Sequence, residues 1–107
     1  MTTPLEGRIA ADLRERTHDG SVTPAQTVAR AVARARAVHA ERDGLNIFVS
    51  LDEKHLAVHA AQGAAQLADT EPGLLLGVPV AIKDNIATLH HPTTCGSHIL
   101  AGYVSPY

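Results

Sequence analysis

Apolar residues recur at helical spacing in three parts of this 107-residue chain. The first part predicts a short helix that ends at residues 18–20, where Asp-Gly follows a histidine. The second predicts a helix that is capped at residue 23 and runs to about residue 40, and the third predicts a helix over residues 53–68. The apolar positions behind these predictions are Leu5, Ile9 and Leu13, then Val28, Val32 and Ala35, then Leu56, Ala60, Ala64 and Leu67.

The start of the second helix carries a local signal of its own. Thr23-Pro24-Ala25-Gln26 has the form of a capping box, in which the threonine hydroxyl accepts from the Gln26 backbone amide and the Gln26 side chain reaches back. Pro24 suits the first helical position, where no backbone donor is needed. We therefore expect this helix to begin at Pro24.

Two shorter stretches have the pattern of β-strands. Residues 45–51 follow an Asp43-Gly44 turn and alternate, with Leu45, Ile47, Val49 and Leu51 on one face. Residues 74–82 are almost continuously apolar, as in a strand covered on both faces, and Asp84-Asn85 then breaks the run. N-terminal helices followed by strand, helix and strand predict an α/β architecture, with a right-handed crossover if the strands pair in parallel.

Composition limits what such a fold can bury. The chain has no tryptophan and one phenylalanine, Phe48, so its 45% apolar content rests largely on alanine. A thin core and marginal stability are therefore expected, as in a single incomplete domain over residues 1–107. The net charge of −2 provides no basic field for nucleic acid, and Arg30, Arg34 and Arg36 are interpreted as a solvated helix face.

The remaining composition favours the cytoplasm. The single cysteine, Cys95, excludes an internal disulfide framework and fits a reducing compartment. Residues 1–20 lack the apolar stretch of a secretory signal, and no run is long enough to span a membrane. We therefore expect a cytoplasmic chain without membrane contact.

Lys83 is the candidate for chemistry, because the apolar run ends on it. Burial at that place disfavours the charged ammonium, which would make the lysine a proton acceptor. The alternative is a strand-end lysine that extends to water and serves solubility. Spacing alone leaves both interpretations open.

The whole segment resembles a known family. Gly77 to Asn85 reads G-V-P-V-A-I-K-D-N, Thr93 to Ser97 reads T-T-C-G-S, and the chain closes with I-L-A-G-Y-V-S-P-Y from Ile99. Together they are similar to the amidase signature family, and within it to the A subunits of tRNA-dependent glutamyl-tRNA(Gln) amidotransferases. The resemblance implies a serine, cis-serine and lysine triad that releases ammonia from glutamine, with Lys83 as the catalytic lysine.

The resemblance also implies what this chain lacks. The two family serines lie in a Gly/Ser-rich segment downstream of the lysine, and Ser21, Ser50, Ser97 and Ser105 have no such surroundings. We therefore expect an N-terminal part of a longer enzyme, inactive alone. The implied partners are the other amidotransferase subunits, which would use ATP and hold the tRNA; no cofactor is expected in this chain. A stand-alone amidase acting on a small amide, or a truncated interaction module without catalysis, remains an alternative.

Seven histidines raise the question of a metal. His55 and His59 lie four residues apart, as a helical pair of ligands would, but without a zincin glutamate or a third ligand. His90, His91, Cys95 and His98 match no standard zinc spacing, so no metal site is predicted. Leu89-His90-His91-Pro92 also departs from the family, which usually has a glycine shortly after K-D-N-I.

Overall fold

The computed structural model describes residues 10–40, 45–69 and 73–107. Along these residues the elements are α1 (Ala10–His18), α2 (Pro24–Ala40), α3 (Glu53–Asp69) and a short 3-10 helix, η1 (His98–Leu100). The chain divides into two units, each made of two separate stretches. The first unit comprises Met1–Leu45 and Asp52–Pro79, and the second comprises Asn46–Leu51 and Val80–Tyr107.

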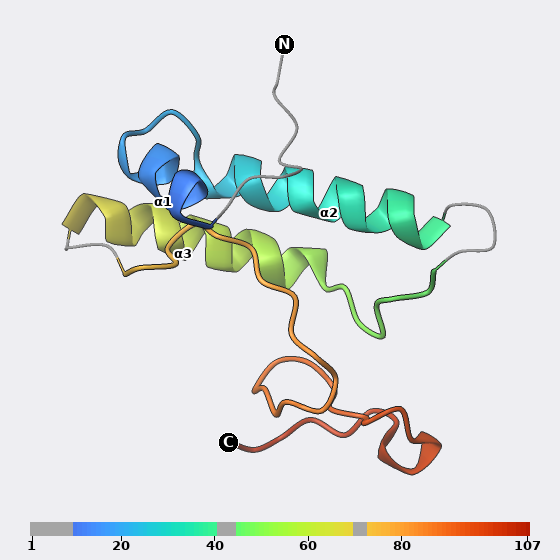
Figure 1. Cartoon of the computed structure of the whole chain (residues 1–107). Helices are drawn as coiled ribbons and strands as arrows, with labels where there is room; N and C mark the ends of the chain where they lie inside the picture. Colours follow the sequence, from blue (N-terminus) through green and yellow to red (C-terminus); the bar gives the residue numbers. More distant parts are fainter. Residues whose placement is uncertain (1–9, 41–44, 70–72) are drawn as a thin grey trace. The chain divides into compact units, whose positions relative to one another are not determined.

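Helices build the first unit. α2 and α3 have 17 residues each and lie side by side in opposite directions, and α1 lies at the end of this pair where α2 begins and α3 ends (Figure 1). The predicted helices are confirmed: α1 ends at His18, α2 ends at Ala40, and α3 ends one residue beyond the predicted Ala68. Leu5 and Ile9 lie outside the described residues. None of the described helices combines the length and apolar character needed to cross a bilayer.

The predicted capping box opens α2. The Thr23 hydroxyl accepts from the Gln26 backbone N–H at 3.2 Å, and the Gln26 side chain accepts from the Thr23 N–H at 2.9 Å. Two of the orphan backbone donors at this end of the helix are thereby satisfied. The helix accordingly begins at Pro24, as the sequence predicts.

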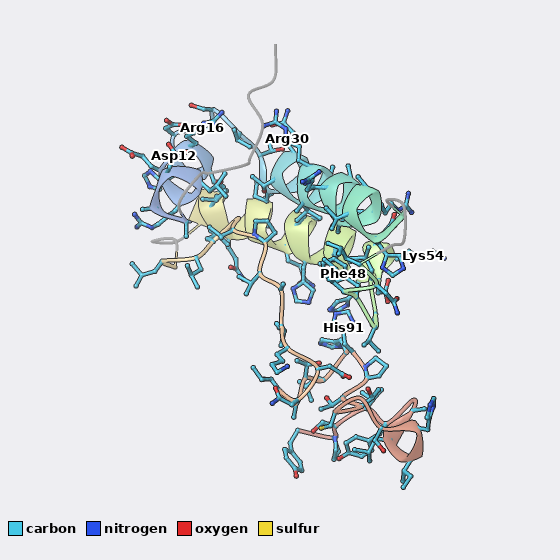
Figure 2. All side chains as sticks on the ribbon, turned by 45° about the vertical axis from the view of Figure 1, so that its right-hand side comes forward. Asp12, Arg16, Arg30, Phe48, Lys54 and His91 are labelled. Carbon is cyan, nitrogen blue, oxygen red and sulfur yellow. The ribbon has the colours of Figure 1, made fainter. Side chains whose placement is uncertain are left out.

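Three arginines, at positions 30, 34 and 36, lie on α2. Arg34 and Arg36 are exposed as expected, whereas Arg30 is half-buried and its side chain extends away from α3 (Figure 2). The Arg36 guanidinium pairs with the Glu53 carboxylate at the start of α3. Both side chains are well exposed, so the pair contributes little to stability.

A small core holds the first unit together. Among the described residues, Leu13, Val22, Pro24 and Ala60 are buried apolar residues, accompanied by buried Thr17 and Thr27. The predicted stripe of Val28, Val32 and Ala35 is only half-buried. This thin core agrees with the scarcity of large apolar and aromatic residues in the chain.

Gly77 ties the segment after α3 to the other helices. The hydroxyl of Thr27, a residue that is 0% exposed, donates to the Gly77 carbonyl at 2.9 Å. Gly77 has φ of +79°, and a Cβ placed on it would lie 2.6 Å from Cγ2 of Thr17. Only glycine fits here. Any side chain would be strained by the left-handed backbone conformation and would also clash with the Thr17 methyl group.

The predicted strands are wrong within the described residues. Residues 45–51 have no strand pairing, and Leu45, Ile47 and Val49 are exposed. Residues 74–77 form a turn and 78–83 are irregular, with Leu74 and Val80 exposed by 80% and 64%. A strand needs a neighbour that accepts and donates its backbone hydrogen bonds, and the described residues supply only one isolated bridge. The strand-helix-strand prediction therefore fails, although the middle helix is correct.

Hydrogen bonds between loops organise the second unit. Pro92 and Val104 form the antiparallel bridge, and the Thr93 N–H donates to the Tyr103 carbonyl at 2.8 Å. η1 lies between these two positions and is capped by Ser97, whose hydroxyl accepts from the Ile99 N–H at 3.2 Å. Residues 92–104 therefore form a closed loop that ends in the last, red part of the chain in Figure 1.

Candidate active site

Lys83 begins a tight turn in the second unit. Its carbonyl accepts from the Ile86 N–H at 3.0 Å, and Asp84 and Asn85 occupy the middle of the turn. The Lys83 side chain is exposed, and Ile82 before it is 55% exposed. The expectation that a buried strand delivers this lysine is therefore wrong for the described chain. Lys83 lies instead at the junction of an exposed apolar segment and a turn.

The Asp84 carboxylate joins this turn to residues 93–97, which we call the 93–97 loop. It accepts from the Thr94 hydroxyl, from the Thr94 N–H at 2.7 Å and from the Gly96 N–H at 3.4 Å. The Asp84 carbonyl accepts in addition from the Cys95 N–H at 3.1 Å. Asp84 thus binds consecutive residues of the loop through its side chain and its backbone.

A second tie lies at the other end of the turn. The Thr93 hydroxyl donates to the Ile86 carbonyl at 3.5 Å. Thr93 and Thr94 are both buried, at 7% and 9% exposure, although the residues around them are mostly exposed. The turn that begins at Lys83 is therefore held to the 93–97 loop at both Asp84 and Ile86.

These hydrogen bonds set the electrostatics of Asp84. The Thr94 hydroxyl, donating to the carboxylate, is the main reason that the pKa of Asp84 lies below its ordinary value. The Thr94 and Gly96 backbone N–H groups and the neighbouring Lys83 charge act in the same direction. Hydrogen bonds to an ionised carboxylate favour that form, so Asp84 is an anion near neutral pH.

The loop adopts a conformation that suits this binding. Cys95 has φ of +52° and Gly96 has φ of +71°, so two successive residues are left-handed. This turns the backbone N–H groups of residues 94–96 toward Asp84. Cys95 itself is exposed, which agrees with a loop cysteine and not with a buried one.

The sequence pattern does not reveal this role of Asp84. Asp84-Asn85 is recognisable as a turn that ends an apolar run. The sequence pattern does not indicate that the Asp84 carboxylate also binds the 93–97 loop. The partner Thr94 lies ten residues away in sequence, beyond any helical or strand period. The sequence signal that could have indicated this role is the pair Thr93-Thr94 before Cys95, because threonine hydroxyls can donate to a nearby carboxylate.

The Leu89–Pro92 segment, in which the sequence predicts a departure from the family, makes defined contacts within the second unit. The Thr88 hydroxyl donates to the His91 carbonyl at 3.3 Å. The Ser50 hydroxyl and Nδ1 of His91 lie 3.4 Å apart. These contacts give the segment a defined backbone.

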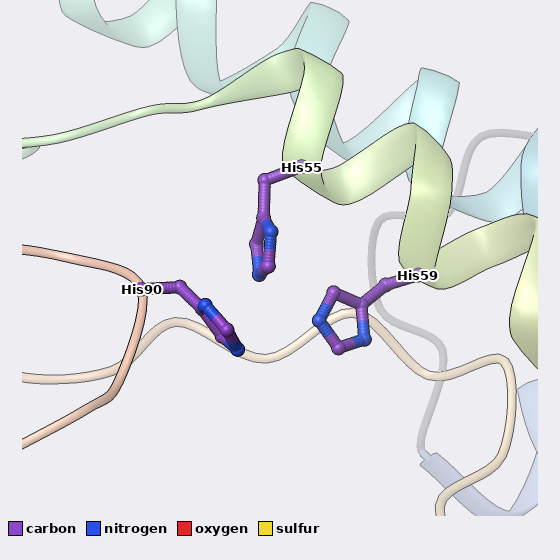
Figure 3. Close-up of side chains that lie close together, drawn as sticks. All are labelled: His55, His59 and His90. Atoms are coloured by element: carbon purple, nitrogen blue, oxygen red, sulfur yellow. The ribbon is translucent and has the colours of Figure 1, made fainter. Parts of the chain in front are cut away.

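The two histidines of α3 form a pair. His55 and His59 lie on successive turns with ring centroids 4.3 Å apart and an edge-to-face angle of 70° (Figure 3). The third ring drawn in that figure belongs to His90, a residue of the other unit. Within the described chain, the other candidate set, around Cys95, does not bring three ligand atoms within 4.8 Å of one another.

The chain is similar to known proteins over most of its length. Residues 26–107 match the family described as Amidase. The chain is 47% identical to a protein of Deinococcus radiodurans named as the A subunit of glutamyl-tRNA(Gln) amidotransferase, over 92% of this chain and 19% of that protein. A protein of the same name from Rhodopirellula baltica is 35% identical, again over 92% of this chain and 19% of its own length.

A third relative, from Deinococcus deserti, has the same name and is 48% identical over 82% of this chain and 17% of its own length. The chain therefore spans about a fifth of the length of the curated relatives it matches. No solved structure matches it.

Proposed function

Because this chain belongs to the Amidase family, we propose that it is the N-terminal part of the glutamine-hydrolysing subunit of a tRNA-dependent amidotransferase. The proposal is carried by the similarity, over 92% of the chain, to proteins named as the A subunit of glutamyl-tRNA(Gln) amidotransferase. Since the chain spans 19% of their length, the activity is that of a longer protein containing this sequence.

Lys83 is the base of a serine, cis-serine and lysine triad in this proposal. Its unprotonated amine accepts a proton from the bridging serine, which accepts the hydroxyl proton of the nucleophilic serine. The serine oxygen bonds to the amide carbon of glutamine, and the C–N bond breaks. The nitrogen takes a proton back through the triad and leaves as ammonia. Water then hydrolyses the acyl-enzyme to glutamate.

Both serines of the triad lie outside residues 1–107 in this proposal. The hydroxyls of Ser97 and Ser105 are engaged with backbone groups of their own loops. The chain supplies the base, its turn and the 93–97 loop, and a Gly/Ser-rich segment supplies the nucleophile. The 107-residue chain alone therefore hydrolyses no glutamine.

The ammonia serves a second reaction on a partner subunit. There the side-chain carboxylate of Glu-tRNA(Gln) is activated with ATP and converted to the amide of Gln-tRNA(Gln). The net charge of −2 supplies no phosphate-binding field, which is consistent with tRNA contacts on the partner. Other amidotransferase subunits are thus the proposed partners, and glutamine is the proposed substrate.

Substitution of Lys83 tests the catalytic assignment. In the full-length protein, Lys83→Ala lowers the rate of glutamine hydrolysis by a factor of about 10²–10⁴, as expected for loss of a general base. Lys83→Arg is equally inactive, because a guanidinium keeps the charge but does not give up its proton. The measurement is ammonia release by purified protein whose folding has been checked by circular dichroism.

The chain offers a matched control in its other lysine. Lys54 is exposed on α3 (Figure 2), and Lys54→Ala and Lys54→Arg retain full turnover. Near-normal activity of Lys83→Arg would return Lys83 to a role in charge or solubility and would refute the proposal. Full activity on a small amide without partner subunits, tRNA or ATP would favour a stand-alone amidase instead.

A further inference from the structure

Asp84 is adjacent to the proposed base, yet the triad assigns it no role. Its carboxylate accepts from the Thr94 hydroxyl and from the N–H groups of Thr94 and Gly96, and its carbonyl accepts from the Cys95 N–H. One surface aspartate therefore takes four donors from three consecutive residues. A residue that only formed a turn would need none of them.

We infer that Asp84 is a positioning residue for Lys83, which it holds by fastening the turn at residues 83–86 to the 93–97 loop. This inference rests on the proposed function, since it assumes that Lys83 is the base. The physical reason is that the two residues are adjacent in the chain. The carbonyl of Lys83 accepts the hydrogen bond that closes the turn, and the next residue, Asp84, binds the 93–97 loop. Movement of Asp84 relative to the loop therefore moves the Lys83 backbone.

An ionised carboxylate is the group best suited to this task. It has two oxygens that accept several hydrogen bonds at once, and charge-assisted bonds are shorter and stronger than neutral ones. The lowered pKa of Asp84, caused first by the Thr94 hydroxyl, keeps these acceptors available near neutral pH. Proton transfer in turn depends on geometry, because a displacement of about 1 Å at a catalytic group can cost about 10²-fold in rate.

The Asp84 contacts lend themselves to a graded set of variants in the full-length protein. Asp84→Ala removes both oxygens, whereas Asp84→Asn keeps the size and one acceptor without the charge. Thr94→Val removes the hydroxyl and keeps the shape, and Thr94→Ser restores the hydroxyl. If Asp84→Ala does not fold, Asp84→Asn and Thr94→Val carry the test.

Matched controls exist for both residues. Asp19, in the first unit, also accepts a backbone hydrogen bond, from the Ser21 N–H at 2.7 Å, and its pKa is likewise lowered. Asp19→Ala therefore removes a hydrogen-bonded carboxylate that is unrelated to Lys83. Thr88→Val removes the hydroxyl bond to the His91 carbonyl within the second unit.

Two measurements are made on each variant: kcat and KM for glutamine hydrolysis, and hydrogen–deuterium exchange of the 93–97 loop by mass spectrometry. Asp84→Ala lowers kcat by about 10–100-fold with KM changed less than about twofold, and the loop exchanges faster. Thr94→Val shows a smaller loss of about tenfold, and Thr94→Ser stays within about twofold of the parent protein. Asp19→Ala and Thr88→Val leave kcat unchanged.

Two results would overturn the inference. In one, Asp84→Ala loosens the loop while kcat stays at the parent value, which would make Asp84 a structural residue only. In the other, neither exchange nor kcat changes. Lys83→Ala, measured alongside, distinguishes failure of the proposed function from failure of the positioning role. If Lys83→Ala keeps its glutaminase activity, the proposed function fails. If Lys83→Ala is inactive and Asp84→Ala is fully active, only the positioning role of Asp84 is refuted.

Discussion

Single residues determine the backbone path at two places in this chain. Asp84 collects hydrogen-bond donors from the 93–97 loop, and Gly77 lets the chain pass close to Thr17 and Thr27. Both are small or turn-forming residues whose sequence context indicates only a break in regular structure. Their partners lie ten or more residues away, so neither role can be derived from local pattern.

Substitution of Gly77 tests the close approach. Gly77→Ala places a Cβ 2.6 Å from the Thr17 methyl group in a left-handed backbone. Left-handed strain costs about 1–2 kcal/mol and overpacking a further 1–3 kcal/mol or so. The urea midpoint for loss of helical circular dichroism in the chain should therefore fall markedly.

Gly20 is the control for that substitution, because it has φ of +80° with no atom within 4 Å of the added Cβ. Gly20→Ala should show the backbone strain alone and a smaller shift of the midpoint. Equal shifts for the two variants would mean that the Thr17 contact contributes nothing.

At the scale of elements, helices are predictable from this sequence and strands are not. The stop at His18-Asp19-Gly20 and the capping box at Thr23 are local signals, because a helix satisfies its hydrogen bonds within its own segment. Residues 45–51 and 74–82 have strand-like patterns, but a strand depends on a partner elsewhere in the chain. These patterns indicate only where apolar residues lie. The described residues provide no neighbouring strand with which either segment could pair.

The same contrast holds for the candidate site. Lys83 can be proposed as a site residue from its place at the end of an apolar run and from the family resemblance. The pattern of that run predicts burial, however, and Ile82 and Val80 are exposed. The hydrogen bonds of Asp84 to Thr94 and Gly96 require the folded loop and cannot be derived from spacing.

The capping box makes a prediction for α2. Thr23→Ala removes the acceptor of the Gln26 N–H and destabilises the first turn by about 1 kcal/mol. Hydrogen exchange of amides in that turn should accelerate by about fivefold, which corresponds to the same free energy. Thr23→Ser keeps a capping hydroxyl and should exchange at nearly the parent rate; an unchanged rate in Thr23→Ala would show that the cap is dispensable.

On the scale of the whole molecule, apolar surface remains uncovered. Leu74, Ile99 and Tyr107 are exposed by 80%, 94% and 85%. The buried apolar side chains of the described residues are few and small. Burial of apolar area is the main source of folding cooperativity, so this chain has little to make unfolding all-or-none.

The 107-residue chain by itself should therefore unfold gradually. Its helical signal, which comes chiefly from α2 and α3, should decline over a broad range of temperature, and amide resonances of the second unit should be lost first. Circular dichroism and two-dimensional NMR during heating measure both. A single sharp transition, with dispersed signals persisting for all residues until it occurs, would contradict this expectation.

Because each unit is made of two separate stretches of the chain, the two units cannot be completed in simple order during synthesis on the ribosome. Asn46–Leu51 belongs with Val80–Tyr107, but the whole of α3 is synthesised between these stretches. His91, which lies 3.4 Å from the Ser50 hydroxyl, is translated roughly 2–8 s after that serine at about 5–20 residues per second. The helical unit can therefore assemble while the nascent chain still lacks the turn that carries Lys83, and the serines proposed to complete the triad would be synthesised later still.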